Sequence, residues 1–168
     1  RDRPIAPQSE FILYMMEQMS HFGLPCTEEQ AKDFYMYYAH MIETNKYLNL
    51  TGITDMKEVV VKHMIDSLSC YDSEIIKSGM TIIDVGTGAG FPGIPLAIYD
   101  RSLKVTLFDS LKKRLTFLES VIDKLKLTNC TILHGRAEDL SHQDYRESFD
   151  IATSRAVARL PILLEWTV

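Results

Sequence analysis

A glycine-rich stretch that follows an apolar run constrains the fold of this chain more than any other feature. Residues 81–97 read TIIDVGTGAGFPGIPLA, with glycines at positions 86, 88 and 90 directly after the apolar run. Such a run, bounded by glycines, is typical of a buried strand. Glycines at its end let the backbone turn sharply and approach a ligand closely. A helix is expected next, with Pro92 in its first turn, where the missing N–H costs nothing.

From Met80 onward, short apolar runs alternate with helical segments. The runs are TIIDV, KVTLFD, TILHG and FDIATSRAV. Residues 111–126 form the clearest helical segment, with Leu115, Leu118, Ile122 and Leu125 on one face. Strands separated by helices of this length pair in parallel through right-handed crossovers. We therefore expect an α/β fold with a doubly wound, Rossmann-like sheet.

The first third of the chain predicts a helical cap. Residues 9–22 place Ile12, Met15, Met16, Met19 and Phe22 at helical spacing. Thr27 and Gln30 have the spacing of a capping box, and so do Asp55 and Glu58, so helices are expected from each pair. The polar connection at residues 72–79 marks the boundary, which gives a helical region of residues 1–74 and an α/β domain of residues 75–168.

The aromatic run FYMYY lies in the second of these helices. Its apolar face consists of Phe34, Tyr37, Tyr38 and Met41. The helical spacing favours a helix-packing seam over a platform on which nucleobases stack.

Bulk composition excludes several classes of protein. The net charge is −5, which argues against general adhesion to nucleic acid but leaves room for a local basic patch. Cys26, Cys70 and Cys130 are far apart, so we expect buried thiols, with neither a disulfide framework nor a metal site. No run approaches the length of a membrane span, and the N-terminus lacks the apolar core of a signal peptide, so a cytoplasmic protein is expected.

An acidic residue at the end of the second strand points to a nucleoside cofactor. Asp109 lies 23 positions beyond Gly86, close to the spacing at which a carboxylate binds ribose hydroxyls. A nicotinamide fingerprint, G-x-G-x-x-G, would need glycine where Phe91 stands. The observed G-x-G-x-G, with Gly86, Gly88 and Gly90, resembles motif I of S-adenosylmethionine (SAM) methyltransferases. A nicotinamide oxidoreductase stays as an alternative.

Longer segments resemble one family. NLTGIT, VKHMIDSL, DVGTGAGFPGIPLAI, DSLKKRLTFL, HGRAEDL and FDIATSRAVA are similar to the RsmG (GidB) family of bacterial 16S rRNA methyltransferases, over roughly residues 46–159. The resemblance implies methyl transfer from SAM to N7 of a guanine in the small-subunit rRNA. It also implies cofactor contacts from Gly86, Phe91, Asp109 and Arg155, with Ala137 and Glu138 beside the adenine.

The sequence departs from the usual pattern at its end. Class I methyltransferases have seven-stranded sheets, and we expect the C-terminal strands to be missing from these 168 residues. The alternatives are therefore a non-catalytic module that binds SAM or RNA, or a different class I methyltransferase.

The implied reaction needs no general base, because guanine N7 carries a lone pair and no proton. No catalytic residue is therefore assigned. A cysteine nucleophile would be needed inside the α/β region, and Cys26 lies outside it. The expected partner is 16S rRNA in the small subunit or an assembly intermediate, bound by a monomer. Phosphate contacts are expected from six basic residues: Lys112, Lys113, Arg114, Arg136, Arg155 and Arg159.

Three further residues have two interpretations each. His63 either joins the helical cap to the opening of the substrate site or is a structural histidine whose hydrogen bonds are made within the fold. The residue type favours the structural role. His134 is similarly open. Asp84 either holds the cofactor's amino group or orders the glycine loop through backbone N–H bonds.

Overall fold

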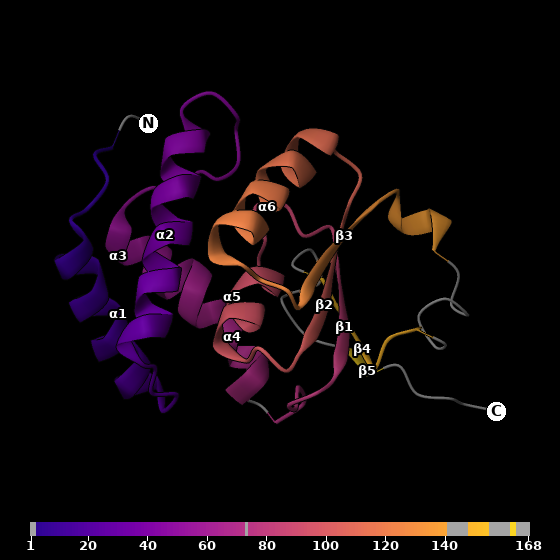
Figure 1. Cartoon of the computed structure of the whole chain (residues 1–168), viewed down its shortest axis with the longest axis horizontal. Helices are drawn as coiled ribbons and strands as arrows, with labels where there is room; N and C mark the ends of the chain where they lie inside the picture. Colours follow the sequence, from indigo (N-terminus) through magenta and orange to yellow (C-terminus); the bar gives the residue numbers. More distant parts are fainter. Residues whose placement is uncertain (1–2, 73, 141–147, 155–161, 164–168) are drawn as a thin grey trace.

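The structure, a computed structural model, describes residues 3–72, 74–140, 148–154 and 162–163 of the 168. Its elements form three layers from left to right in Figure 1: the N-terminal helices, further helices in the middle and the β-sheet. Among the described residues, the α-helices all stand on one face of the sheet.

The outer layer contains α1 (Gln8–Phe22) and α2 (Glu28–Asn45). The capping box that starts α2 is confirmed: the Gln30 amide donates to Thr27 Oγ1 at 3.0 Å, and the Thr27 amide donates to Gln30 Oε1 at 2.8 Å. The expected packing seam of α2 is also confirmed, because its aromatic face is buried. The buried face of α1 differs in part from the expected one. Met15 and Met19 are buried as expected, but Phe11 completes the buried row at i, i+4, i+8, and Ile12, Met16 and Phe22 are only partly buried.

The next helical run begins as expected and then widens. Asp55 caps α3 (Met56–Glu58), with its carboxylate accepting from the Glu58 amide at 3.2 Å. The run continues as a π-helix, η1 (Val59–Ile65), and then as α4 (Asp66–Asp72). Sequence periodicity did not anticipate the π-helix, a form that occurs frequently at functional sites.

The sheet has the order β3-β2-β1-β4-β5. Its strands are β1 (Thr81–Val85), β2 (Lys104–Asp109), β3 (Cys130–His134), β4 (Ile151–Ser154) and the short β5 (Ile162–Leu163). The first four are parallel and β5 is antiparallel to β4. Helices α5 (Gly93–Tyr99) and α6 (Lys112–Leu125) connect β1 to β2 and β2 to β3. The predicted Rossmann-like α/β sheet is confirmed. The doubly wound arrangement, with helices on both faces, is not seen in the described residues, whose α-helices cover one face.

One apolar core joins the helical layers to the sheet. It runs from Phe34 and Met41 in α2 through Leu118 in α6 to Ile82 and Leu107 in the central strands. The division at residues 74 and 75 coincides with the connection between α4 and β1, yet the buried cluster continues across it.

Candidate functional site

The candidate site lies at the carboxyl end of β1, where the strand order reverses between β1 and β4. Ligands of open α/β sheets bind at such a reversal. The glycine loop, residues 86–92, connects β1 to α5 there. Gly86, Gly88 and Gly90 all have positive φ angles, of 69°, 61° and 109°. A side chain on Gly86 or Gly88 would meet no heavy atom within 4 Å, so the loop presents bare backbone to open space at both positions.

Gly90 is small for a different reason. A Cβ atom there would lie 2.6 Å from Ile94 Cγ1 and 2.7 Å from the Tyr37 hydroxyl oxygen. Packing of α2 and α5 against the loop therefore accounts for Gly90. Gly93 is similar, because a Cβ would lie 2.5 Å from Leu107 Cδ2. The sequence pattern did not single out Gly93.

Asp84 orders the glycine loop from beneath. This carboxylate is fully buried, and its Oδ2 accepts from Thr87 Oγ1 at 2.6 Å and from the Gly93 amide at 2.9 Å. Its Oδ1 accepts from Thr153 Oγ1 of β4 at 3.2 Å. A buried carboxylate needs such donors to offset desolvation. Of the two interpretations of Asp84, the loop-ordering one is the one these contacts support.

Asp109 ends β2 beside the loop, as expected. Its Oδ2 accepts from the Gly88 amide at 2.8 Å, and its Oδ1 accepts from the Leu111 amide at 2.9 Å. Arg114 forms an ion pair with Oδ1 at 3.5 Å. The side chain is 2% exposed. A carboxylate has about four acceptor positions, so these three donors leave one for a ligand.

Phe91 connects the loop to the N-terminal helices. Its ring is 1% exposed and stacks on the His63 ring, with centroids 4.3 Å apart. Tyr37 packs against the Phe91 ring, and its hydroxyl donates a hydrogen bond to the Ala89 carbonyl at 2.6 Å. His63 Nε2 also bonds to Thr51 Oγ1 at 2.9 Å. His63 is therefore a buried, satisfied histidine that also joins the helical layer to the loop.

The other expected site residues are placed as follows. Ala137 and Glu138 are exposed on η2 (Ala137–Asp139), a 3₁₀ helix shortly after β3. His134 is exposed, with Nε2 3.1 Å from the Ser110 carbonyl oxygen. Lys112, Lys113 and Arg136 are exposed, whereas Arg114 is engaged by Asp109. Arg155 and Arg159 lie outside the described residues.

The cysteines are not activated nucleophiles. Burial raises the pKa of Cys70 to about 11 and that of Cys130 to about 12, so both are thiols at neutral pH. Cys26 is only half-buried, unlike the expectation, and burial raises its pKa as well. In the part of the chain that the structure describes, no helix has the length and apolarity to span a membrane.

The parallel sheet, the glycine loop and the acid at the end of β2 define a class: the chain is a Rossmann-like α/β protein of the class I methyltransferase fold. Coclaurine N-methyltransferase, solved with N-methylheliamine and SAH, shares this fold with a TM-score of 0.50 and 14% identity, covering 89% of this chain and 51% of that one.

Sequence comparison identifies the family. The model of rRNA small subunit methyltransferase G (GidB) matches residues 30–168. The relative of that name from Leuconostoc mesenteroides is 47% identical over 91% of this chain and 65% of its own length. The one from Thermoanaerobacter sp. strain X514 is 50% identical over 96% of this chain and 68% of its own. The chain belongs to the rRNA small subunit methyltransferase G family, and it spans about two thirds of the length of these curated relatives.

Proposed function

We propose that this chain transfers a methyl group from SAM to N7 of a guanine in 16S rRNA. The observation that carries the proposal is the bare backbone of Gly86 and Gly88 beside Asp109, in a member of this family. The cofactor contacts would come from Gly86, Gly88, Gly90, Phe91, Asp109, Ala137, Glu138 and Arg155.

The described residues fit such a cofactor. The space over Gly86 and Gly88 is open, and Asp109 keeps one acceptor position for a ribose hydroxyl. Glu138 is exposed on η2 and free to accept from an exocyclic amine. Gly90 and the Phe91 ring are engaged in packing, so any contribution from these two residues would come from backbone atoms.

The residues of the site would act by positioning. When bound, SAM supplies an electrophilic methyl group on a positively charged sulfur. Guanine N7 attacks such a methyl group with its own lone pair, so the protein need not remove a proton. Holding the reacting atoms in line contributes roughly 7 to 11 kcal/mol to lowering a barrier of this kind. The rigid loop, fixed by Asp84, Tyr37 and Asp109, is suited to that task.

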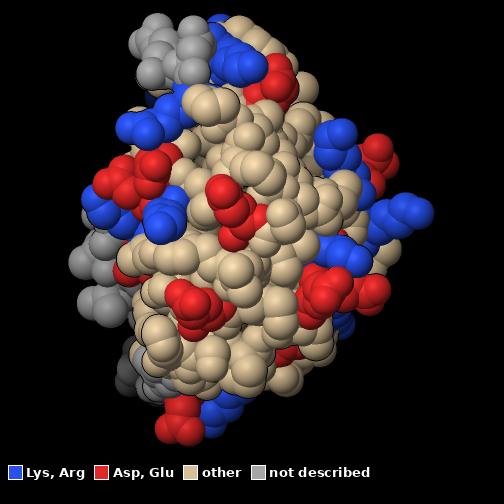
Figure 2. Space-filling model, turned by 90° about the vertical axis from the view of Figure 1, so that its left-hand side faces the viewer, with Lys and Arg blue, Asp and Glu red and all other residues tan. Residues whose placement is uncertain are grey.

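The accessibility of N7 restricts the substrate. N7 lies on the major-groove edge, which side chains cannot reach in A-form RNA. A single-stranded loop, in the small subunit or an assembly intermediate, would expose it to a cytoplasmic monomer. Exposed Lys112, Lys113 and Arg136 would contact its phosphates. Figure 2 shows that the outer helical face is mostly uncharged, with acidic and basic side chains scattered over it, so its described residues form no basic patch that would favour RNA.

The test is binding followed by turnover. Calorimetric titration with SAM should show saturable binding, and NADH should show none. The chain is then incubated with SAM and small subunits that lack the modification, and the rRNA is mapped for 7-methylguanosine by mass spectrometry. An RNA carrying 7-deazaguanine at the mapped position should accept no methyl group. SAM binding without any methyl transfer would favour the non-catalytic module, and methylation at another atom would indicate a different methyltransferase.

A further inference from the structure

A polar cavity lies beside the segment that follows α2. It has a volume of about 410 Å³, within the usual range for ligand pockets. All of its lining residues come from one segment, which we call the 45–54 loop: Asn45, Lys46, Tyr47, Asn49, Thr51, Gly52 and Thr54. The cavity is separate from the glycine loop, and nothing in the methyl-donor site uses it.

The 45–54 loop is held in shape by its own hydrogen bonds. Asn45 Oδ1 accepts from the Leu50 amide at 2.7 Å and from the Thr51 amide at 3.0 Å. Asn45 Nδ2 donates to the Thr51 carbonyl at 3.0 Å, and Thr51 Oγ1 accepts from the Ile53 amide at 3.0 Å. A pocket formed before its ligand arrives loses less conformational entropy on binding.

The 45–54 loop lies one side chain away from the glycine loop. Thr51 contacts His63 at 2.9 Å, and the His63 ring stacks on Phe91 at 4.3 Å. Figure 1 shows the loop after α2 at the same end of the molecule as the start of α6, which follows the carboxyl end of β2. The cavity therefore borders the side from which a substrate would approach the methyl donor.

The chemistry of the lining suits an unpaired nucleobase. Tyr47 is 80% exposed, so its ring offers an uncovered face for stacking. Asn49 and Thr54 carry groups that donate and accept hydrogen bonds, as base edges require. Lys46 adds a positive charge, shared with Glu43 at 3.4 Å. We propose that the 45–54 loop binds a base of the substrate RNA, with Tyr47 as the stacking surface. This proposal rests on the proposed function.

The test measures RNA binding apart from methyl transfer. The probe is a 5′-fluorescein-labelled RNA hairpin with guanines in a single-stranded loop, followed by fluorescence anisotropy at fixed salt with SAM present. Tyr47→Ala should weaken binding about fivefold or more, as expected for the loss of one base stacked on an aromatic ring. Tyr47→Phe keeps the ring and should stay within about twofold of the original chain. Leu13→Ala is the matched control, because Leu13 is 71% exposed on α1.

A parallel calorimetric titration with SAM separates this proposal from the proposed function. Tyr47→Ala should bind SAM as the original chain does. Equal RNA affinity of the Tyr47→Ala variant and the original chain would contradict the proposal that the 45–54 loop binds a base. Loss of SAM binding together with RNA binding would also overturn it, since Tyr47 would then support the fold. If the original chain bound SAM but not the hairpin, the result would contradict the proposed base pocket and leave the proposed cofactor site intact.

Discussion

Asp109 and the Gly88 amide form the contact on which the candidate site depends. The carboxylate is nearly inaccessible, and it links the end of β2 to the loop after β1. Within the proposed cofactor site it would have two tasks, holding the loop and accepting from a ribose hydroxyl. Removing it should therefore affect both the ligand and the loop.

The Asp109→Ala substitution should weaken SAM binding by about 1 to 3 kcal/mol, roughly 5- to 150-fold, the scale of hydrogen bonds to a charged group. Calorimetry measures the dissociation constant. Asp123→Ala, an exposed acid near the end of α6, is the control and should leave the affinity unchanged. An unaltered affinity in the Asp109→Ala variant would remove this residue from the cofactor site.

The glycines of the loop should respond differently to alanine. In Gly90→Ala the new Cβ atom would clash with Ile94 and Tyr37, and the backbone at this position has a positive φ. The substitution should therefore lower the free energy of unfolding by about 2 to 5 kcal/mol. In Gly88→Ala the new Cβ atom would contact no other heavy atom, so only the strain of a positive φ should lower the free energy of unfolding, by about 1 to 2 kcal/mol. Urea denaturation of both variants tests this, and equal losses would contradict the packing role assigned to Gly90.

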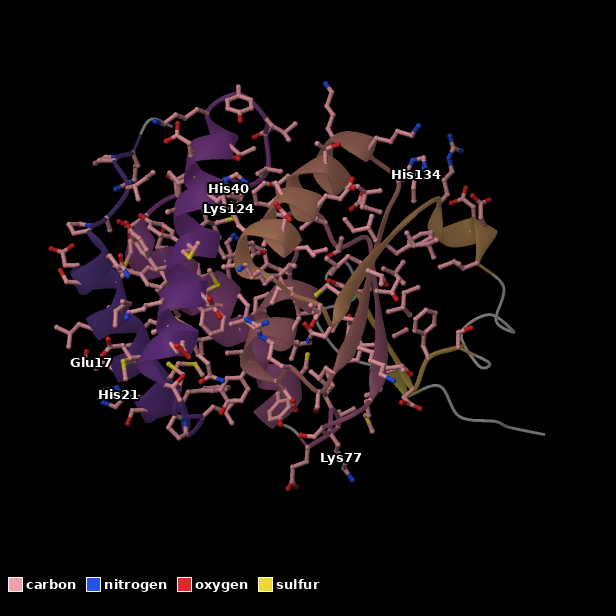
Figure 3. The ribbon with its side chains drawn as sticks, in the orientation of Figure 1. Glu17, His21, His40, Lys77, Lys124 and His134 are labelled. Carbon is pink, nitrogen blue, oxygen red and sulfur yellow. The ribbon has the colours of Figure 1, made fainter. Side chains whose placement is uncertain are left out.

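At the scale of elements, the contact between α2 and α6 contains a titrating histidine. His40 Nε2 lies 2.7 Å from Ser120 Oγ, and its ring stacks on Phe117 at 5.3 Å. Burial, and then the positive charge of Lys124, lower the pKa of His40 below its ordinary value of 6.5. Figure 3 shows His40 and Lys124 next to each other between the two helices.

This pKa makes stability depend on pH. Between the lowered pKa of folded His40 and 6.5, the unfolded chain binds more protons, so the free energy of unfolding falls as the pH drops through that window. Lys124→Ala should move the pKa of His40 back toward 6.5, as measured by an NMR titration of the imidazole protons. Lys77→Ala, at the other end of the molecule in Figure 3, is the control. If Lys124→Ala left the pKa in place, the charge of Lys124 would have no part in the shift.

Local patterns predicted the elements better than the contacts between them. The capping box at Thr27 and Gln30, the apolar strands and the acid at position 109 each follow from spacing of a few residues. The π-helix lies within one segment, but the apolar spacing of that segment did not distinguish it from an α-helix. The stacking of His63 on Phe91 joins residues 28 positions apart, which no local pattern encodes. For the same reason the sequence did not show that position 90 requires glycine because of the nearby Tyr37 side chain rather than because of a ligand.

At the scale of the whole molecule, the N-terminal helices are part of the site rather than a separate module. Tyr37 and His63 hold the glycine loop, and one apolar core joins the helical layers to the sheet. The division at residues 74 and 75 therefore describes the order of elements along the chain more than a break in packing.

A shared core predicts cooperative unfolding. Far-ultraviolet circular dichroism, which reports the helices, and amide hydrogen exchange of β1 and β2 should give coincident transitions in urea. Adding SAM should shift both together, since a ligand of the folded state stabilises all of it. Loss of helical signal at a lower urea concentration than loss of strand protection would instead indicate two independent units.

The most direct test of the account is the structure of this chain crystallised with SAM. The ribose is expected beside Asp109, with the remainder of the cofactor lying over Gly86 and Gly88 and its methyl group directed toward the side that the 45–54 loop borders. A cofactor bound elsewhere, with the glycine loop vacant, would contradict the central claim.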